Sequence, residues 1–342
     1  MSVGLKFAAI AALYVGVAIA GLALGSVPLP VSEVLAGLFG GDVPTVTEAI
    51  LFDVRMTRTI TALLVGAALG VTGLMMQTLF RNPLADPYVL GVSSGASLGV
   101  ALVVLVVGGT AYGTTFTSGL GVSGDVLAIL AAAGGSAVTM LIVIAVGRFV
   151  RSSNTLLLMG VMLGYLVSSL VTIMLANAQP EAIAQFTRWG FGSYQGVTWS
   201  NLKVLAPVLI VFLLLSLPMA KGLNVLLLGE RYAETMGVNI KVLRMLIVLV
   251  SAVLAGASTA FCGPISFLGM ALPHLTRSIL GTSNHRLLIP GVILVGGCLA
   301  LTAEILAQLP GNGVLPLNAV NAALGAPVVI YILLRRSKEM AL

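Results

Sequence analysis

The chain has 342 residues, of which 58% are hydrophobic and 8% are charged, and its mean hydropathy is +1.12. This number of charged residues is too small to cover the surface of a soluble domain. The composition therefore excludes a soluble globular protein and predicts a polytopic membrane protein. The net charge of +6 does not indicate nucleic-acid binding, because no basic run stands beside an aromatic platform.

Ten stretches of the chain are candidates for membrane-spanning helices, which need about 20 mainly apolar residues each. They cover residues 5–26, 57–80, 90–108, 125–148, 155–177, 202–219, 244–262, 265–280, 288–308 and 318–334. The third and the eighth are short and interrupted by Gly, Ser or Pro. The sequence therefore predicts an all-α fold, with residues 1–342 forming a single transmembrane domain.

The distribution of basic residues predicts the orientation of these spans. With the N-terminus inside the cell, 13 of the 17 basic residues fall in cytoplasmic segments, and the others are Arg55, Arg58, Arg188 and Lys203. The positive-inside rule therefore predicts that both termini are cytoplasmic. Residues 1–24 also resemble a signal peptide, but their apolar run is long enough to span the membrane, so we interpret them as the first span.

Glycines recur at the spacing that lets membrane helices approach closely. Gly66 and Gly70 form one such pair, and Gly160 and Gly164 form another. Small residues four positions apart lie on one face of a helix and allow two backbones to come together. Each pair is a candidate for a helix–helix contact, although the pattern is also common by chance in a glycine-rich membrane protein.

Two features suggest chemistry, and both have a simpler interpretation. Residues 91–95 match the G-x-S-x-G pattern of a hydrolase nucleophile, which would make Ser93 the nucleophile of an intramembrane hydrolase. That motif needs a strand before it and a His partner, so packing or a polar path wall is the simpler interpretation. His274 and His285 lack further ligands at metal-binding spacing, so no metal site is predicted. We expect His285 to be solvated in a loop or to contact a phosphate group on the side of a partner.

Glu304 is the clearest ionisable residue inside a predicted span. An intramembrane carboxylate is a functional candidate, so a proton-coupled secondary transporter using Glu304 is an alternative function. Proton coupling usually needs a relay of several such groups, and a single Glu could equally cap a backbone or pair with a neighbour.

The stretch from Lys221 to Arg244 is a polar interruption between two apolar spans, with six charged residues in 24 positions. The predicted topology places it in the cytoplasm. Its centre, residues 229–237, predicts a short helix bounded by glycine, with apolar and acidic faces. Such a helix suits docking into a groove on a soluble protein. A solvated loop with an incidental helical turn is the alternative.

The sequence contains no Gly-Lys dipeptide, so it lacks a P-loop and does not bind ATP in the standard way. Energy for active transport must then come from an ion gradient or from another subunit. The scarcity of ionisable residues in the spans argues against the gradient, and the polar loop favours the subunit.

Several motifs, in one order along the chain, resemble the FecCD family, the permease subunit of ATP-binding-cassette (ABC) importers for iron-siderophores, haem and cobalamin. The matching segments are residues 55–59, 66–70, 77–95, 156–160, 228–238, 263–269, 273–277, 285–290 and 324–327. The resemblance extends from about residue 55 to residue 335, which is nearly the whole chain.

The resemblance implies the ABC type II importer permease fold in the bacterial inner membrane, with ten helices per subunit and a homodimer around a central path. It also implies two ATPase subunits, which would bind ATP and magnesium on the cytoplasmic side, and a periplasmic substrate-binding protein. This chain itself would bind no cofactor or metal and catalyse no covalent reaction.

The resemblance also implies roles for individual residues. The family's ATPase-coupling helix corresponds to Gly229, Glu230, Ala233, Glu234, Met236 and Gly237. Its cytoplasmic gate corresponds to Asn82, Leu84, Ser153 and Asn154. Its outer arginines, which contact the binding protein, correspond to Arg55 and Arg58, and the position of a further basic contact in some relatives holds Gln308.

Overall fold

The computed structural model describes residues 2–25, 27–107, 124–147, 149–150, 152–309 and 313–340, and every regular element in these ranges is a helix. The ten predicted spans correspond to α1 (Val3–Ala23), α4 (Thr57–Phe80), α5 (Val92–Ala101), α7 (Gly124–Gly147), α8 (Ser153–Ala176), α10 (Trp199–Ser216), α13 (Ile240–Cys262), α14 (Leu268–Leu280), α15 (His285–Gln308) and α16 (Leu317–Met340). Seven helices in the described part are long and apolar enough to cross a membrane. The predicted all-α membrane fold is confirmed.

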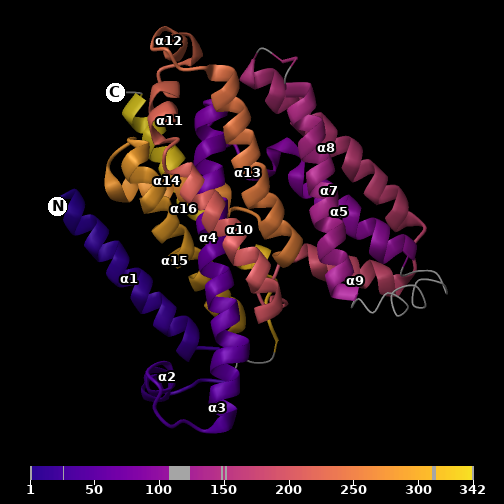
Figure 1. The fold of residues 1–342 in the computed structure, drawn as a ribbon, viewed down its shortest axis with the longest axis vertical. Helices are drawn as coiled ribbons and strands as arrows, with labels where there is room; N and C mark the ends of the chain where they lie inside the picture. Colours follow the sequence, from indigo (N-terminus) through magenta and orange to yellow (C-terminus); the bar gives the residue numbers. More distant parts are fainter. Residues whose placement is uncertain are drawn as a thin grey trace.

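The long helices stand side by side as a bundle around α4 (Figure 1). Helix α4 is almost entirely buried and packs against α10, α13, α14 and α15. Helix α1 covers α15 on one flank, and α5, α7 and α8 pack together on the other side of α13. A long and almost entirely buried helix therefore lies at the centre of the bundle.

The two ends of the bundle carry different short elements (Figure 1). At one end lie α2 (Val31–Leu38) and α3 (Thr45–Ala49), which leads through the π-helical turn η1 (Ile50–Met56) directly into α4. At the other end lie α11 (Ala220–Leu226) and α12 (Glu230–Thr235). A further short helix, α9 (Pro180–Gly190), follows α8. We refer to the two ends as the α2–α3 end and the α12 end.

The contacts of α4 with α14 and α15 are made backbone to backbone through glycines. A Cβ atom on Gly73 would overlap the Gly269 carbonyl oxygen, and one on Gly66 would overlap the Gly296 carbonyl oxygen. A Cβ on Gly70 would lie 2.6 Å from Val292 Cγ1. The predicted contact of the Gly66 and Gly70 pair is therefore present, because these positions leave room for the backbone of α15.

The third span is short because the chain folds back into the protein before it starts. Helix α4 ends at Arg81, whose φ of 48° is left-handed, and the next residues run back between helices. The Pro83 carbonyl accepts a hydrogen bond of 2.7 Å from His274 in the middle of α14. The Tyr88 hydroxyl, in the turn η2 (Pro87–Leu90), accepts a bond of 3.1 Å from the Ile265 amide. Helix α5 therefore begins deep within the bundle.

Replacing Gly73 with Val tests how tightly α4 is packed. The new side chain would displace the Gly269 backbone, which cannot rotate away, and overpacking of this kind typically costs about 1–3 kcal/mol. We expect a lower melting temperature of the detergent-purified protein. Gly16→Val is the matched control, because a Cβ at exposed Gly16 of α1 meets no atom within 4 Å. Equal melting temperatures for the two variants would contradict this packing.

Candidate functional site

Helix α12 is bounded by glycines in conformations that other residues rarely adopt. Gly229 precedes it with a φ of +109°, and Gly237 follows it with a φ of +80°. The Val238 amide donates to the Ala233 carbonyl at 3.0 Å and closes the C-terminal end. The predicted short helix within residues 229–237 is therefore confirmed.

Helix α12 turns one face inward and presents a mixed face to solvent. Ala233 is completely buried, whereas Tyr232 and Met236 are 51% and 57% exposed. Leu228, just before the helix, is 62% exposed, and Glu234 is also exposed. The result is an apolar patch beside an acidic side chain at the tip of the molecule, a combination suited to contact with another protein.

A cavity of about 860 Å³ beneath α12 brings together three of the four predicted gate residues and two of the six predicted coupling residues. Its walls include Asn82, Ser153 and Asn154 from the gate set and Gly229 and Glu230 from the coupling set. The side chain of Leu84 does not line this cavity and is 49% exposed. Segments that are far apart in sequence therefore meet at the α12 end.

Glu230 connects the coupling and gate residues directly. Its Oε1 atom accepts hydrogen bonds from the Ser153 hydroxyl and, at 2.9 Å, from the Arg244 guanidinium. Arg244 also donates to the Val150 carbonyl at 3.1 Å. The sequence gives no sign of this role for Arg244, because its partners Glu230 and Val150 lie on other segments of the chain.

At the opposite end, Arg55 is buried and bonded within the chain. Its guanidinium donates to the Leu22 carbonyl at 2.7 Å and to the Val27 carbonyl. It therefore holds the chain that leaves α1 against the start of α4. Its predicted contact with a binding protein stays a prediction.

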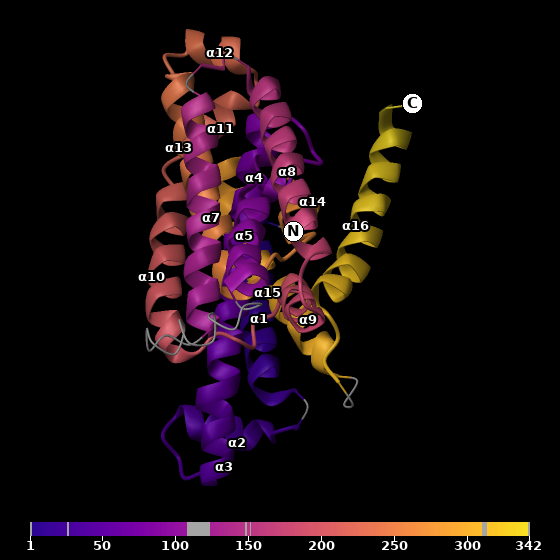
Figure 2. The same cartoon turned by 90° about the vertical axis from the view of Figure 1, so that its right-hand side faces the viewer.

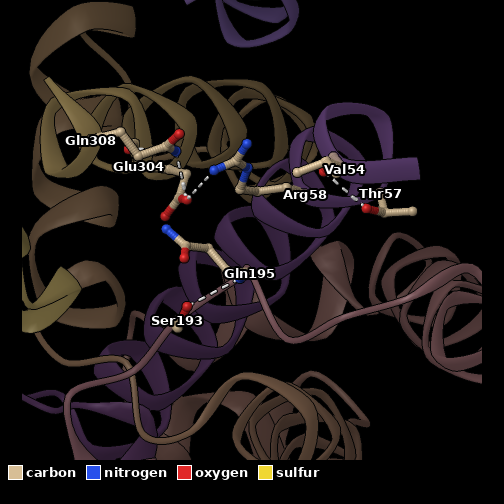
Figure 3. Close-up of polar contacts among 7 residues, drawn as sticks. All are labelled: Val54, Thr57, Arg58, Ser193, Gln195, Glu304 and Gln308. Atoms are coloured by element: carbon tan, nitrogen blue, oxygen red, sulfur yellow. Dashed lines mark hydrogen bonds and ion pairs between the residues drawn. The ribbon is translucent and has the colours of Figure 1, made fainter. Parts of the chain in front are cut away.

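Arg58 and Glu304 form an ion pair between α4 and α15, with 3.7 Å between Nη1 and Oε1 (Figure 3). Glu304 also accepts a hydrogen bond of 2.8 Å from the Gln308 amide, one turn further along α15. The Gln195 amide points toward the same carboxylate (Figure 3). Glu304 is thus paired with a neighbour, as one of the interpretations of the sequence expected, and its charge is balanced by Arg58.

His285 is completely buried, so the expectation that it would be solvated is wrong. Its Nδ1 atom lies 2.9 Å from Asn224 Oδ1, and its Nε2 atom lies 2.8 Å from Thr78 Oγ1. These bonds join the start of α15 to α11 and α4. The sequence could not show this, because Asn224 and Thr78 lie far from His285 along the chain.

The other candidate sites find no support in the described residues. Residues 91–95 form the start of α5, and no strand precedes them in the described part of the chain, so the nucleophile motif lacks its structural context. No group of three or more His, Cys, Asp or Glu side chains suited to a metal ion occurs there.

A model of the FecCD transport family matches residues 12–335. The chain belongs to the FecCD transport family. It is 37% identical over 298 residues to the vitamin B12 import system permease protein BtuC of Salmonella typhi, with 85% of each chain covered. The corresponding protein of Salmonella arizonae is 36% identical over 298 residues, covering 85% of this chain and 84% of the relative. The similarity is to permease subunits of transport systems.

Solved structures agree with this family assignment. A chain assigned to the metal-chelate type of ABC transporter, in an inward-facing conformation, superposes with a TM-score of 0.83 at 27% identity, covering 97% of this chain and 99% of that one. A chain of PsaBC from Streptococcus pneumoniae in complex with Fab has a TM-score of 0.53 at 18% identity, covering 89% and 95%, and supports the fold alone. The predicted type II importer permease fold is confirmed for this FecCD chain.

A double-mutant cycle tests the ion pair of the FecCD chain at its α2–α3 end. Glu304→Ala leaves Arg58 in a largely buried place without its carboxylate, and breaking a buried pair of this kind typically costs about 3–5 kcal/mol. We expect Glu304→Ala to lower the melting temperature in detergent, and the Arg58→Ala and Glu304→Ala double variant to lose less than the sum of the single losses. Strictly additive losses would show that the two side chains do not interact.

Proposed function

We propose that this chain is the transmembrane permease subunit of an ABC importer that moves a bulky metal chelate across the bacterial inner membrane, with cobalamin as the first candidate cargo. The observation that carries this proposal is the similarity to vitamin B12 import permeases along 85% of both chains. Iron-siderophores and haem are the other cargoes that the family membership suggests.

The energy comes from two separate ATPase subunits, which hold ATP and magnesium and dock on α12. The exposed patch of Leu228, Tyr232 and Met236 beside Glu234 supports this, because a protruding amphipathic helix fits a groove on a soluble partner. The α12 end is then cytoplasmic, as are both chain termini. Lys6, near the start of α1, agrees with this placement, since its Nζ donates to the Leu280 carbonyl at the end of α14.

The functional unit is a homodimer whose two copies enclose the path of the cargo. Support comes from α8, which exposes both apolar and polar side chains along its length, among them Met162, Tyr165 and Ser169. Helix α16 slants away from the rest of the bundle, and α8 lies on the same side of it in this view (Figure 2). A second copy on this side would cover surfaces that a single chain leaves bare.

A periplasmic binding protein delivers the cargo at the α2–α3 end, where Arg58 and the buried Arg55 lie. Acidic side chains on the binding protein would compete with Glu304 for Arg58, since Arg guanidinium groups pair well with carboxylates. On the cytoplasmic side, Asn82, Leu84, Ser153 and Asn154 form the gate that α12 controls.

Proton coupling through Glu304 is the weaker explanation of transport. The carboxylate is held by Arg58 and Gln308, and a stably paired carboxylate is poorly suited to exchange protons with solvent.

Met236→Asp tests ATPase docking on α12. A new charge in the exposed apolar patch must be desolvated on docking, so we expect the affinity for the ATPase subunit to fall about tenfold or more. The measurement is co-purification and binding of the ATPase subunit to the permease in nanodiscs.

Ser283→Asp is the matched control, because it adds the same charge at an exposed position in the connection between α14 and α15. We expect it to bind the ATPase subunit like the wild-type chain. Normal binding by Met236→Asp would place the docking surface elsewhere.

Uptake by proteoliposomes tests the cargo and the energy source. The permease is reconstituted with its ATPase subunits and its binding protein, and the uptake of cobalamin, haem and a ferric siderophore is compared. We expect ATP-dependent cobalamin uptake that survives a proton ionophore, because the energy comes from ATP. Uptake that needs no ATPase subunit but collapses with the proton gradient would favour proton coupling, and uptake of another chelate alone would exclude cobalamin.

A further inference from the structure

Glu230 is the first residue of α12, yet its carboxylate points toward the membrane helices and away from the exposed docking patch. It accepts hydrogen bonds from two elements at once, the Ser153 hydroxyl at the start of α8 and the Arg244 guanidinium in α13. Its side chain is 29% exposed, so these bonds are partly shielded from water. One carboxylate therefore joins three helices.

Arg244 extends this connection to the corner between α7 and α8. Its guanidinium is largely buried, and besides Glu230 it contacts the Val150 carbonyl at 3.1 Å. Val150 lies three residues before the first residue of α8. The corner is thus bound to α12 through Ser153 directly and through Arg244 indirectly.

Two cavities border this connection. Glu230 lines the cavity of about 860 Å³ that contains gate residues, and it also lines a second cavity of about 690 Å³ between α7, α12 and α13. Helix α12 itself packs against α11 and α13. The hydrogen bond between Glu230 and Ser153 therefore provides a direct side-chain connection from α12 to the start of α8.

The chemistry of the contacts suits a mechanical joint. Hydrogen bonds in which one of the two groups is charged are shorter and about twice as strong as neutral ones, and they have a fixed direction. A displacement of α12 would therefore pull on the first turn of α8. Ala233, on the inward face of α12, is buried and apolar, so its side chain makes no directional contact comparable to the hydrogen bonds of Glu230.

We propose that Glu230, Arg244 and Ser153 form the linkage through which movement of α12 reaches the start of α8 and opens or closes the gate. This inference rests on the proposed docking of ATPase subunits on α12. It assigns Arg244 and Ser153 as positioning residues of the transport cycle, and it gives Glu230 an inward role distinct from contact with the ATPase.

A labelling experiment tests the linkage without knowledge of the cargo. Thr155→Cys places a reporter at an exposed position in the first turn of α8, and the two native cysteines, Cys262 and Cys298, are buried. The complex with ATPase subunits is held in nanodiscs, and the rate of reaction with a water-soluble maleimide is measured with and without ATP and magnesium. The wild-type linkage should give an ATP-dependent change in this rate.

Ser153→Ala and Glu230→Ala should abolish the ATP-dependent change in labelling, and the melting temperature and ATPase binding of each variant are measured beside it. Two matched controls should retain the ATP-dependent change in labelling. Ser153→Thr keeps the hydroxyl donor, and Glu230→Gln keeps an oxygen acceptor. Arg244→Lys should show an intermediate change, because one ammonium group cannot reach both Glu230 and Val150 as a guanidinium fork does.

Three outcomes would overturn the linkage. The first is an unaltered ATP-dependent change in both alanine variants. The second is a parallel loss of melting temperature, ATPase binding and labelling response, which would make these residues structural only. The third is a wild-type chain that binds no ATPase subunit. This result would contradict the proposed function together with the linkage, and the measurement on the wild-type chain reveals it before any variant is made.

Discussion

The bilayer offers no water to the backbone, so each polar group of the chain at that depth must find its partner within the protein. This constraint is most demanding in two irregular segments, residues 81–91 and residues 263–267, which lie between helices inside the bundle. The second is held by Asn318, which accepts from the Ser266 amide at 2.9 Å and donates to the Pro264 carbonyl at 2.8 Å. The Tyr88 hydroxyl supplies the partner of the Ile265 amide and so joins the two segments. The short helices α5 and α14 start where these segments end, and their length follows from this arrangement.

The same constraint decides where charge is found. Arg58, at the start of α4, lies with Glu304 toward the α2–α3 end, and Arg244 lies with Glu230, the first residue of α12, at the α12 end. In each case a cation from one helix meets a carboxylate from another element, so that neither charge enters a low-dielectric interior alone. The two pairs differ in their surroundings. Glu304 is enclosed by helices, whereas Glu230 lies between two cavities.

Much of this fold could be predicted from the sequence, because the signals are local. Apolar runs indicated each of the ten helices, with the third and the eighth short and interrupted, and glycines with charges between them indicated α12. The side-chain contacts could not be predicted in this way. Ser153 and Glu230 are 77 residues apart, and His285 and Thr78 are 207 apart. A solvated His in a polar turn was a reasonable expectation for His285, and only the packing of α11 and α4 around it shows that it is buried. The sequence also contained no sign that Arg55 is buried. Its partners are the Leu22 and Val27 carbonyls, and the sequence does not show that this part of the chain lies beside Arg55.

These contacts divide the molecule into a part that resists movement and a part that permits it. Helices α4 and α15 are joined near one end by Arg58 and Glu304 and near the other by Thr78 and His285. Between these points their backbones meet at Gly66 and Gly296, so the pair has little freedom to slide or separate. Helix α8 has no comparable set of contacts among its described residues, because most of its side chains are exposed. Its first residue, Ser153, is hydrogen-bonded to Glu230 of α12 and lines a cavity. In the proposed linkage, a force applied at α12 would be resisted by the α4–α15 pair and would reach α8 through Ser153. Because α8 also bears the surface that we propose to face the cargo path, its movement would matter for transport.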